Sequence, residues 1–295
     1  MRTLKLGLAL GAGGTKGAAH VGVMRVLEDA GLRAEVVAGT SVGSLYGGAY
    51  AVGRTPREME EGIRSCPSGD VVAFFRHRLK IRHNNRLARR FYDALAGHYI
   101  ESLPVRYAAV ASDIVQRRAY TITRGPIIDA IEASIAIPMI ARPVWHQGRY
   151  LLDGGFWDAA PVDAAVDLGA DVVVAVELAR PVTLPARMRE PATWFATRFG
   201  GIGLRRTFAG LPFTLGASAM EVQAGRTANV VLRPRIPRLT GNSPARMVAC
   251  LEAGIEAAQE ALPAIQALLA GESVVEVAGE IGAAPQLRAD PGLAG

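Results

Sequence analysis

Apolar and polar positions along the first forty residues follow the order strand, helix, strand. Residues 4–10 (LKLGLAL) alternate weakly and predict a buried strand. The following stretch, AAHVGVMRVLEDAGL, places Val21, Met24 and Leu27 on one face at helical spacing. Residues 34–38 (AEVVA) predict the next strand. This order predicts a parallel sheet with a right-handed crossover.

The same alternation continues along the chain. A helix is expected from Gly43 to Gly53, and Thr55-Pro56-Arg57-Glu58 resembles a capping box with proline at the first helical position. Further strands are predicted at 106–111, 119–123, 171–178 and 229–233, and helices near 126–135 and from Ser243-Pro244 to about 270. The alternation predicts an α/β three-layer fold, with a mostly parallel central sheet flanked by helices.

We expect one domain over residues 1–270. It would include a basic helical insert at about 71–100, an apolar and aromatic segment at 192–213, and a C-terminal helix at 244–270. The tail at 271–295 is rich in Gly, Ala and Pro and is expected to be mobile. The N-terminus mimics a signal peptide, but cleavage there would remove a glycine loop that the chemistry below needs.

Charge adds an expectation about partners. The net charge is +6, and arginine supplies almost all of it, because the chain has only three lysines. Such a balance reflects either biased composition or attraction to phosphate-bearing surfaces. The basic run at 76–90 is either a solvated face or a contact for anionic head groups; nucleic-acid binding is not expected, because the run offers few aromatic rings. Cys66 and Cys250 match no metal-binding pattern, so we expect free thiols.

A serine between glycines is the first candidate for chemistry. Residues 39–43 (GTSVG) match G-x-S-x-G, with a predicted strand before them and a helix after them. This context favours Ser41 as a nucleophile over a purely structural turn. The order serine, acid, histidine is not available, because none of the five histidines follows Asp153. His20 stays an alternative base, although a histidine on a helix face is usually packed or solvated.

The candidate acid lies in LLDGGF, where an apolar pair leads to Asp153 and two glycines. This pattern is either an ordinary Asp-Gly turn or a carboxylate held at a tight bend, where it accepts the serine proton directly. Asp113, at the end of a predicted strand in VASDI, is the alternative acid.

The loop GAGGTKG at 11–17 is the third candidate. It fails the Walker pattern, and Lys16 stands where G-x-G-x-x-G needs its third glycine, so nucleotide binding is disfavoured. Its backbone N–H groups at a helix start suit an oxyanion as well as a phosphate. Removing one oxyanion donor typically costs ~10²–10³ in rate.

Together these pieces resemble the patatin-like phospholipase family. The matching motifs are AGGTKG (12–17), GTSVG (39–43) and DGG (153–155), with GAAHVGV after the loop and ASIAIPMIARPV before the aspartate. The resemblance covers roughly residues 5–178, and 229–270 more loosely. Ala12 departs from the family pattern, which has glycine there; alanine fits if its φ is negative.

The resemblance implies a calcium-independent serine lipid acyl hydrolase with a Ser–Asp dyad and no cofactor or metal. Ser41 would form an acyl-enzyme, and Asp153 would take its proton and later activate water. The N–H groups of Gly13, Gly14 and Thr15 would form the oxyanion hole. The motif is supported by Gly11, Lys16, Gly17, Gly39, Gly43, Gly154 and Gly155; the lysine would support the loop, meet a head-group phosphate or be solvated.

The implied substrates are fatty-acyl esters of phospholipids or lysophospholipids. The alternatives are an esterase or thioesterase for other acyl substrates, and a noncatalytic membrane-associated regulatory protein that keeps the fold. The segment 192–213 mixes aromatic residues with arginines, which suits a lid, a membrane contact or a helix packed on the core. A cytoplasmic location, or one at the inner membrane face, is expected; the oligomeric state stays open.

Overall fold

The structure is a computed structural model that describes residues 3–67, 86–137, 141–178, 228–237, 243–272 and 286–287. Its strands are β1 (Leu6–Leu10), β2 (Val36–Thr40), β3 (Arg106–Asp113), β4 (Arg118–Ile122), β5 (Val144–His146), β6 (Arg149–Asp153), β7 (Val172–Val176), β8 (Val230–Leu232) and β9 (Gln286–Leu287). Its helices are α1 (Ala18–Asp29), α2 (Val42–Ala51), α3 (Pro56–Arg64), α5 (Arg86–Leu95), α6 (Ile127–Ser134), α7 (Val162–Asp167) and α11 (Pro244–Leu269), with short 3₁₀ turns η1 (Gly14–Gly17), η2 (Ile100–Ser102) and η3 (Gly154–Phe156).

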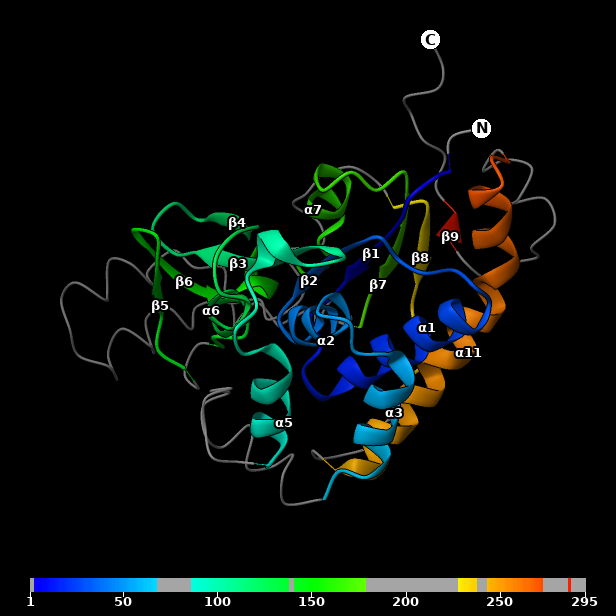
Figure 1. The fold of residues 1–295 in the computed structure, drawn as a ribbon, viewed down its shortest axis with the longest axis horizontal. Coiled ribbons are helices and arrows are strands. Elements are labelled where there is room, and N and C mark those ends of the chain that lie inside the picture. The colour runs from blue at the N-terminus through cyan, green and yellow to red at the C-terminus, as the bar shows by residue number, and fades with distance from the viewer. Residues whose placement is uncertain are drawn as a thin grey trace, which may run out of the picture.

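The strands form one sheet with helices on both faces (Figure 1). Its order is β5-β6-β3-β2-β1-β7-β8-β9, and β4 also pairs with β3. The five central strands, from β3 to β8, run parallel, whereas β4, β5, β6 and β9 pair antiparallel. The predicted α/β fold with a parallel centre is therefore confirmed, and the antiparallel pairs lie at its margins.

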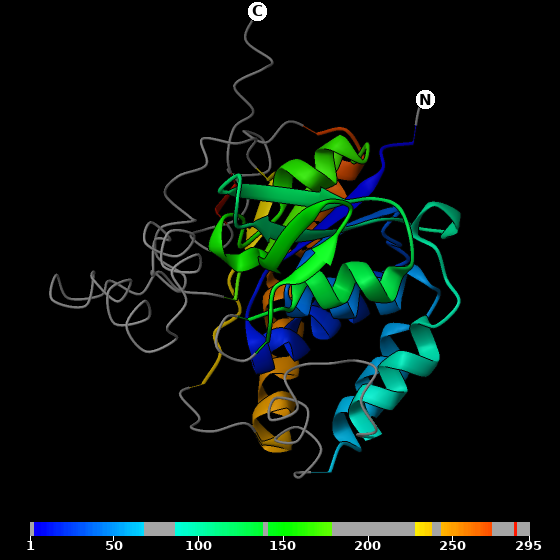
Figure 2. The same ribbon diagram turned by 90° about the vertical axis from the view of Figure 1, so that its left-hand side faces the viewer.

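Neighbouring residues of each central strand face opposite helical layers. Val36 and Ala38 of β2 join the apolar cluster that packs under α7. Val37, between them, joins the larger cluster, which contains apolar residues of α1, α2, α6 and α11. Figure 2 shows the strands between these two layers. Burial on both faces explains why the central strands are almost wholly apolar.

The hairpin of β5 and β6 was not predicted from the sequence. Its two short strands are partly exposed and lack a clear alternating pattern. They are joined by Gln147 and Gly148, whose φ angles of 46° and 79° are both positive. Positive φ at both central residues is what the preferred two-residue hairpin turn requires. The sequence QG is a weaker signal for this turn than NG or DG.

Two expected segments lie wholly or partly outside the described residues. Of the basic insert at 71–100, the structure describes only the part from Arg86, which includes α5. The segment 192–213 is not among the described residues. Within the tail at 271–295, Gln286–Leu287 form β9 and pair with β8. The backbone of β9 covers an edge of β8 that would otherwise be exposed.

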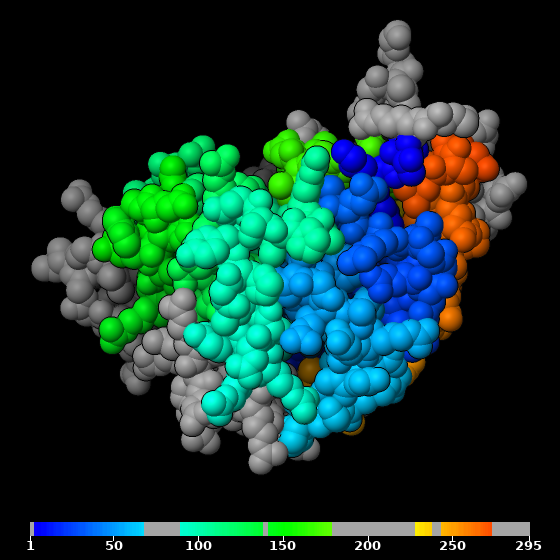
Figure 3. Space-filling model, in the orientation of Figure 1, coloured from blue at the N-terminus to red at the C-terminus, as the bar shows by residue number. Residues whose placement is uncertain are grey.

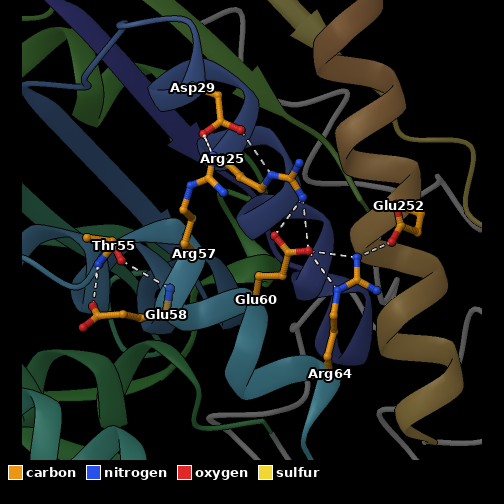
Figure 4. A network of polar contacts seen from close by, with 8 residues as sticks. All are labelled: Arg25, Asp29, Thr55, Arg57, Glu58, Glu60, Arg64 and Glu252. Carbon is orange, nitrogen blue, oxygen red and sulfur yellow. Dashed lines mark hydrogen bonds and ion pairs between the residues drawn. The ribbon is translucent and has the colours of Figure 1, made fainter.

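A network of charged residues joins α1, α3 and α11 (Figure 4). Glu60 of α3 accepts hydrogen bonds from Arg25 of α1 and from Arg64 at 2.8–3.1 Å, and Arg64 also contacts Glu252 of α11. Burial raises the pKa of Glu60, but the hydrogen bonds from Arg64 and Arg25 outweigh it and hold the pKa below its usual value. α3 begins with the capping box predicted at Thr55 and Glu58.

Candidate active site

Ser41 lies at the sharp turn between β2 and α2. Its φ of 54° and ψ of −125° are rarely adopted by a residue with a side chain. A conformation of this kind costs ~1–3 kcal/mol and persists only where the surroundings impose it. The flanking glycines make the turn possible, because a Cβ at Gly39 would overlap the backbone of Gly43, and a Cβ at Gly43 would overlap Leu10 O.

Two further serines hold the backbone of Ser41. The N–H of Ser41 donates to Ser134 Oγ at 2.9 Å, and this hydroxyl donates to Val110 O at 2.6 Å. Ser44 Oγ donates to Ser41 O at 2.6 Å. Neither serine was predicted as part of the site. Ser134 lies within ASIAIPMIARPV, the stretch noted above as similar to the family. That similarity is the signal by which Ser134 could have been found.

Asp153 reaches Ser41 because β3 extends beyond the end of β2. Thr40, the last residue of β2, pairs with Val110, and Asp153 of β6 pairs with Ala111, the next residue of β3. Since β4 pairs with these residues of β3 as well, it occupies the other side of the strand. β6 therefore lies along β3 on the side where β2 has ended. The final residue of β6 then meets the residue that follows β2.

The side chains of Ser41 and Asp153 form a direct hydrogen bond. Ser41 Oγ donates to Asp153 Oδ2 at 2.5 Å, and the N–H of Gly155 donates to Oδ1 at 2.9 Å. Burial raises the pKa of Asp153 to about 6, although the hydrogen bonds from Ser41 and Gly155 lower it in part. The carboxyl group is therefore mostly ionised at neutral pH and can accept a proton from Ser41.

The glycine loop is anchored at its base by three hydrogen bonds. The N–H of Gly11 donates to Val176 O at 3.0 Å, and the N–H of Ala12 donates to Ala159 O at 2.8 Å. His20 Nε2 donates to Gly11 O at 2.8 Å. Both ends of the peptide between Gly11 and Ala12 are therefore held. Ala12 is not among the described residues with positive φ, so the condition for alanine at this position is met.

The loop lies beside the candidate pair. A Cβ added to Gly155 would lie 3.2 Å from Ala12 Cβ, and a Cβ added to Gly17 would overlap Val42, the residue after Ser41. Within the described part of the chain, the N–H groups of Gly13 and Gly14 donate no hydrogen bond. Two free donors at the start of η1, next to the pair, are suited to bind an oxyanion. Thr15 has a partner of its own.

Lys16 supports the loop from the other side. Its Nζ donates to Leu178 O at 3.0 Å, which ties η1 to the segment after β7. This contact is the one expected of a lysine that supports the loop.

The alternative base and acid are both engaged elsewhere. His20 is fully buried against the loop, and burial lowers its pKa to about 4 despite the hydrogen bond to Gly11, so it is neutral near pH 7. Asp113 accepts hydrogen bonds from Arg149 and from the N–H groups of Val115 and Gln116. Burial raises the pKa of Asp113, but these hydrogen bonds outweigh it and lower the pKa.

The described residues contain a cavity and no candidate metal site. No group of three or more His, Cys, Asp or Glu could hold a metal ion there. A cavity of about 450 Å³ lies between α2, α3, α5 and α11, and its opening between α3 and α5 is visible in Figure 3. Tyr46, Phe91 and Met247 are among its lining residues, whereas Ser41 and Asp153 are not. No described helix is long and apolar enough to cross a membrane.

Comparison with known proteins identifies the family. The model of the patatin-like phospholipase family matches residues 8–166, which is more than half of the chain. The chain belongs to the patatin-like phospholipase family. The matched range contains the glycine loop, Ser41 and Asp153, whose catalytic roles stay predictions.

Relatives of this chain include an uncharacterized NTE family protein of Mycobacterium tuberculosis, which is 34% identical over 190 residues, or 63% of this chain and 52% of that protein. Lysophospholipase NTE1 of Yarrowia lipolytica is 32% identical over 184 residues, or 59% of this chain and 12% of that protein. The chain thus spans about half the length of the mycobacterial relative. The crystal structure of VipD from Legionella pneumophila shares the patatin-like fold, with a TM-score of 0.50 and 14% identity over 89% of this chain and 67% of that chain.

Proposed function

We propose that the protein is a serine lipid acyl hydrolase that cleaves fatty-acyl esters of phospholipids or lysophospholipids. The observation that carries the proposal is the 2.5 Å hydrogen bond from Ser41 Oγ to the buried carboxylate of Asp153. Family membership and the lysophospholipase among the relatives support a lipid ester as the substrate.

In the first half of the proposed reaction, Ser41 Oγ attacks the acyl carbonyl carbon while its proton moves to Asp153 Oδ2. The carbonyl oxygen becomes an oxyanion, and the N–H groups of Gly13 and Gly14, with Thr15 beside them, stabilise it. When the tetrahedral intermediate collapses, the ester C–O bond breaks and the leaving alkoxide takes the proton from Asp153. The acyl group remains on Ser41.

In the second half, Asp153 accepts a proton from a water molecule, which attacks the acyl-enzyme. The intermediate collapses, Ser41 Oγ regains the proton from Asp153, and the fatty acid leaves. Asp153 performs both proton transfers, so the proposal needs no histidine, and no step requires calcium. A pKa of about 6 suits a group that must accept and return a proton near neutral pH.

Labelling with a fluorophosphonate probe, followed by peptide mass spectrometry, tests the nucleophile. We expect modification at Ser41 in the wild type and none in Ser41→Ala. Hydrolysis of lysophospholipid should fall by on the order of 10⁴-fold in Ser41→Ala, and by about 10²–10⁴-fold in Asp153→Asn, which removes the general base.

Ser112→Ala is the matched control, because Ser112 is also a buried serine near the end of a parallel strand. It should keep both labelling and activity. Full activity in Ser41→Ala or Asp153→Asn would overturn the proposed mechanism. Hydrolysis of short acyl esters or thioesters, without cleavage of lysophospholipid, would overturn the proposed substrate class and leave the mechanism standing.

A further inference from the structure

The hairpin of β5 and β6 and the neighbouring turn after β3 expose apolar side chains. Trp145 is 61% exposed, Tyr150 is 50% exposed, and Val115 is 66% exposed. Trp145 and Tyr150 are partners across the hairpin, with ring centroids 4.7 Å apart. Val115 follows Ile114, whose N–H donates to Tyr150 O, so the turn lies beside the hairpin.

The same segments are strongly cationic. Residues 114–120 and 141–152 contain four arginines and no acidic residue. Arg149 is occupied, because it pairs with Asp113 at 2.7 Å and lies 4.6 Å from the ring centroid of Tyr120. The other three arginines are exposed and form no ion pair with a described residue. We call the combined area the hairpin surface; it consists of Val115, Arg117, Arg118, Arg142, Trp145 and Tyr150.

β6 connects the hairpin surface to the candidate active site, with Tyr150 and Asp153 on opposite faces of this strand. Tyr150 precedes Asp153 by three residues on this strand, a distance of about 10 Å at ~3.3 Å per residue. Val144 pairs with Leu151, so Arg142 lies toward the Asp153 end of the hairpin. Among the described elements, the hairpin lies at the left-hand side of Figure 1.

We propose that the hairpin surface docks the protein onto an anionic lipid surface. Tryptophan and tyrosine are the side chains that favour the boundary between lipid and water, because one end of each is apolar and the other polar. Arginines near an anionic leaflet add about 1 kcal/mol each. The surface thus combines the apolar and the electrostatic attraction that stable peripheral binding needs.

A nucleic acid fits this surface less well. Trp145 and Tyr150 meet edge to face, at an interplanar angle of 61°, which removes a ring face on which a base could stack. The exposed Val115 has no polar group to bind a nucleic acid, whereas its apolar side chain suits contact with the acyl chains of a lipid surface. The proposal rests on the proposed function, because a lipid substrate near Ser41 is what makes docking about 10 Å away useful.

Vesicle co-sedimentation of the full chain tests the proposal. The protein carries Ser41→Ala, so that no lipid is consumed, and the vesicles contain phosphatidylcholine with or without phosphatidylglycerol. We expect binding to the anionic vesicles only. Trp145→Ala with Tyr150→Ala should weaken binding by on the order of tenfold, and Arg117→Ala with Arg118→Ala by about tenfold or more.

Tyr99→Ala and Arg124→Ala are the matched controls. Tyr99 is 52% exposed beside Pro126, and Arg124 is exposed beyond the other end of β4, so both lie away from the hairpin. Both should bind as the parent does. Equal binding by the Trp145/Tyr150 variant and its parent would overturn the proposal. So would a parent protein that does not bind anionic vesicles. A hairpin variant that loses affinity for single-stranded RNA but not for vesicles would overturn it as well.

Hydrolysis of a soluble short-chain ester separates this proposal from the proposed function. With Ser41 restored, the hairpin variants should hydrolyse the soluble ester at the wild-type rate and lose activity on anionic vesicles. A wild type that fails on every ester would overturn the proposed function, while vesicle binding would still decide the docking proposal.

Discussion

The Ser41–Asp153 hydrogen bond is the smallest unit on which the proposed chemistry depends. The geometry is demanding at the scale of single residues, since a serine with φ of 54° must meet a buried carboxylate. Burial gives that carboxylate its raised pKa, and the raised pKa has consequences for activity and for stability.

Activity should depend on the ionisation of Asp153. Because burial raises its pKa to about 6, the carboxyl group is protonated below that pH and cannot accept the Ser41 proton. We expect kcat/KM for a soluble ester to fall about tenfold per pH unit below about pH 6. A pH–rate profile checks this. If activity stayed constant down to pH 4.5, Asp153 could not be the base.

The free energy of unfolding should depend on pH in the opposite direction to activity. Between about pH 4 and 6 the folded protein keeps a proton on Asp153 that the unfolded chain has lost, so the free energy of unfolding falls as the pH rises through this window. Asp153→Asn removes this loss and should stabilise the protein at pH 7 by about 1–3 kcal/mol. Urea unfolding at pH 7 and pH 4 measures it; a variant less stable than the wild type at pH 7 would contradict the raised pKa.

His20 should position the glycine loop without taking part in proton transfer. His20→Ala frees Gly11 O and leaves a cavity, so we expect kcat to fall by about 10–10²-fold with little change in KM. His20→Gln can still donate to Gly11 O and should recover part of the loss. The pH profile should keep its midpoint near 6 in both variants. A shifted midpoint would indicate that His20 takes part in proton transfer.

At the scale of elements, α1 and α3 support the glycine loop. α1 follows the glycine loop directly, and Glu60 of α3 fixes it through Arg25. Glu60 is only 13% exposed, so removing its carboxylate would leave the arginines without a largely buried ion-pair partner.

Glu60→Ala should therefore lower the free energy of unfolding by about 1–3 kcal/mol. The pair of Arg57 and Asp29 in Figure 4 is the control, because Arg57 is 71% exposed. Arg57→Ala should change stability by less than about 0.5 kcal/mol. Urea unfolding of both variants compares them; similar losses would mean that the Glu60 network is no stronger than an exposed ion pair.

At the scale of the whole molecule, the parallel centre of the sheet brings the loop after β1 and the turn after β2 to one edge, where β6 meets them. The docking proposal places lipid next to this edge. It predicts that hydrolysis of anionic vesicles falls several-fold between about 0.1 M and 1 M NaCl, as the Debye length shrinks from about 10 Å to about 3 Å. The rate with a soluble ester, measured in parallel, should not change. A vesicle rate insensitive to salt would contradict an electrostatic contribution from the arginines.

Local patterns in the sequence were sufficient for much of the fold. The apolar runs of β1, β2 and β7 are buried on both faces, and such runs identify strands without knowledge of their neighbours. The capping box at Thr55 and the serine cap of α11 were predictable for the same reason, because both signals lie within four residues of the chain. The hairpin was missed because its strands are short and partly exposed, and because β6 joins the sheet by pairing with β3, which is distant in sequence.

What the sequence determined by itself was therefore the set of parts: strands, helices, the G-x-S-x-G turn, the glycine loop and a carboxylate before two glycines. Only the tertiary structure decided which of them meet. Ser41 and Asp153 are 112 residues apart, and Ser41 and Ser134 are 93 apart. Their contacts exist because β3 extends past β2 and leaves a place for β6, a relation of strand lengths and register that no local pattern contains.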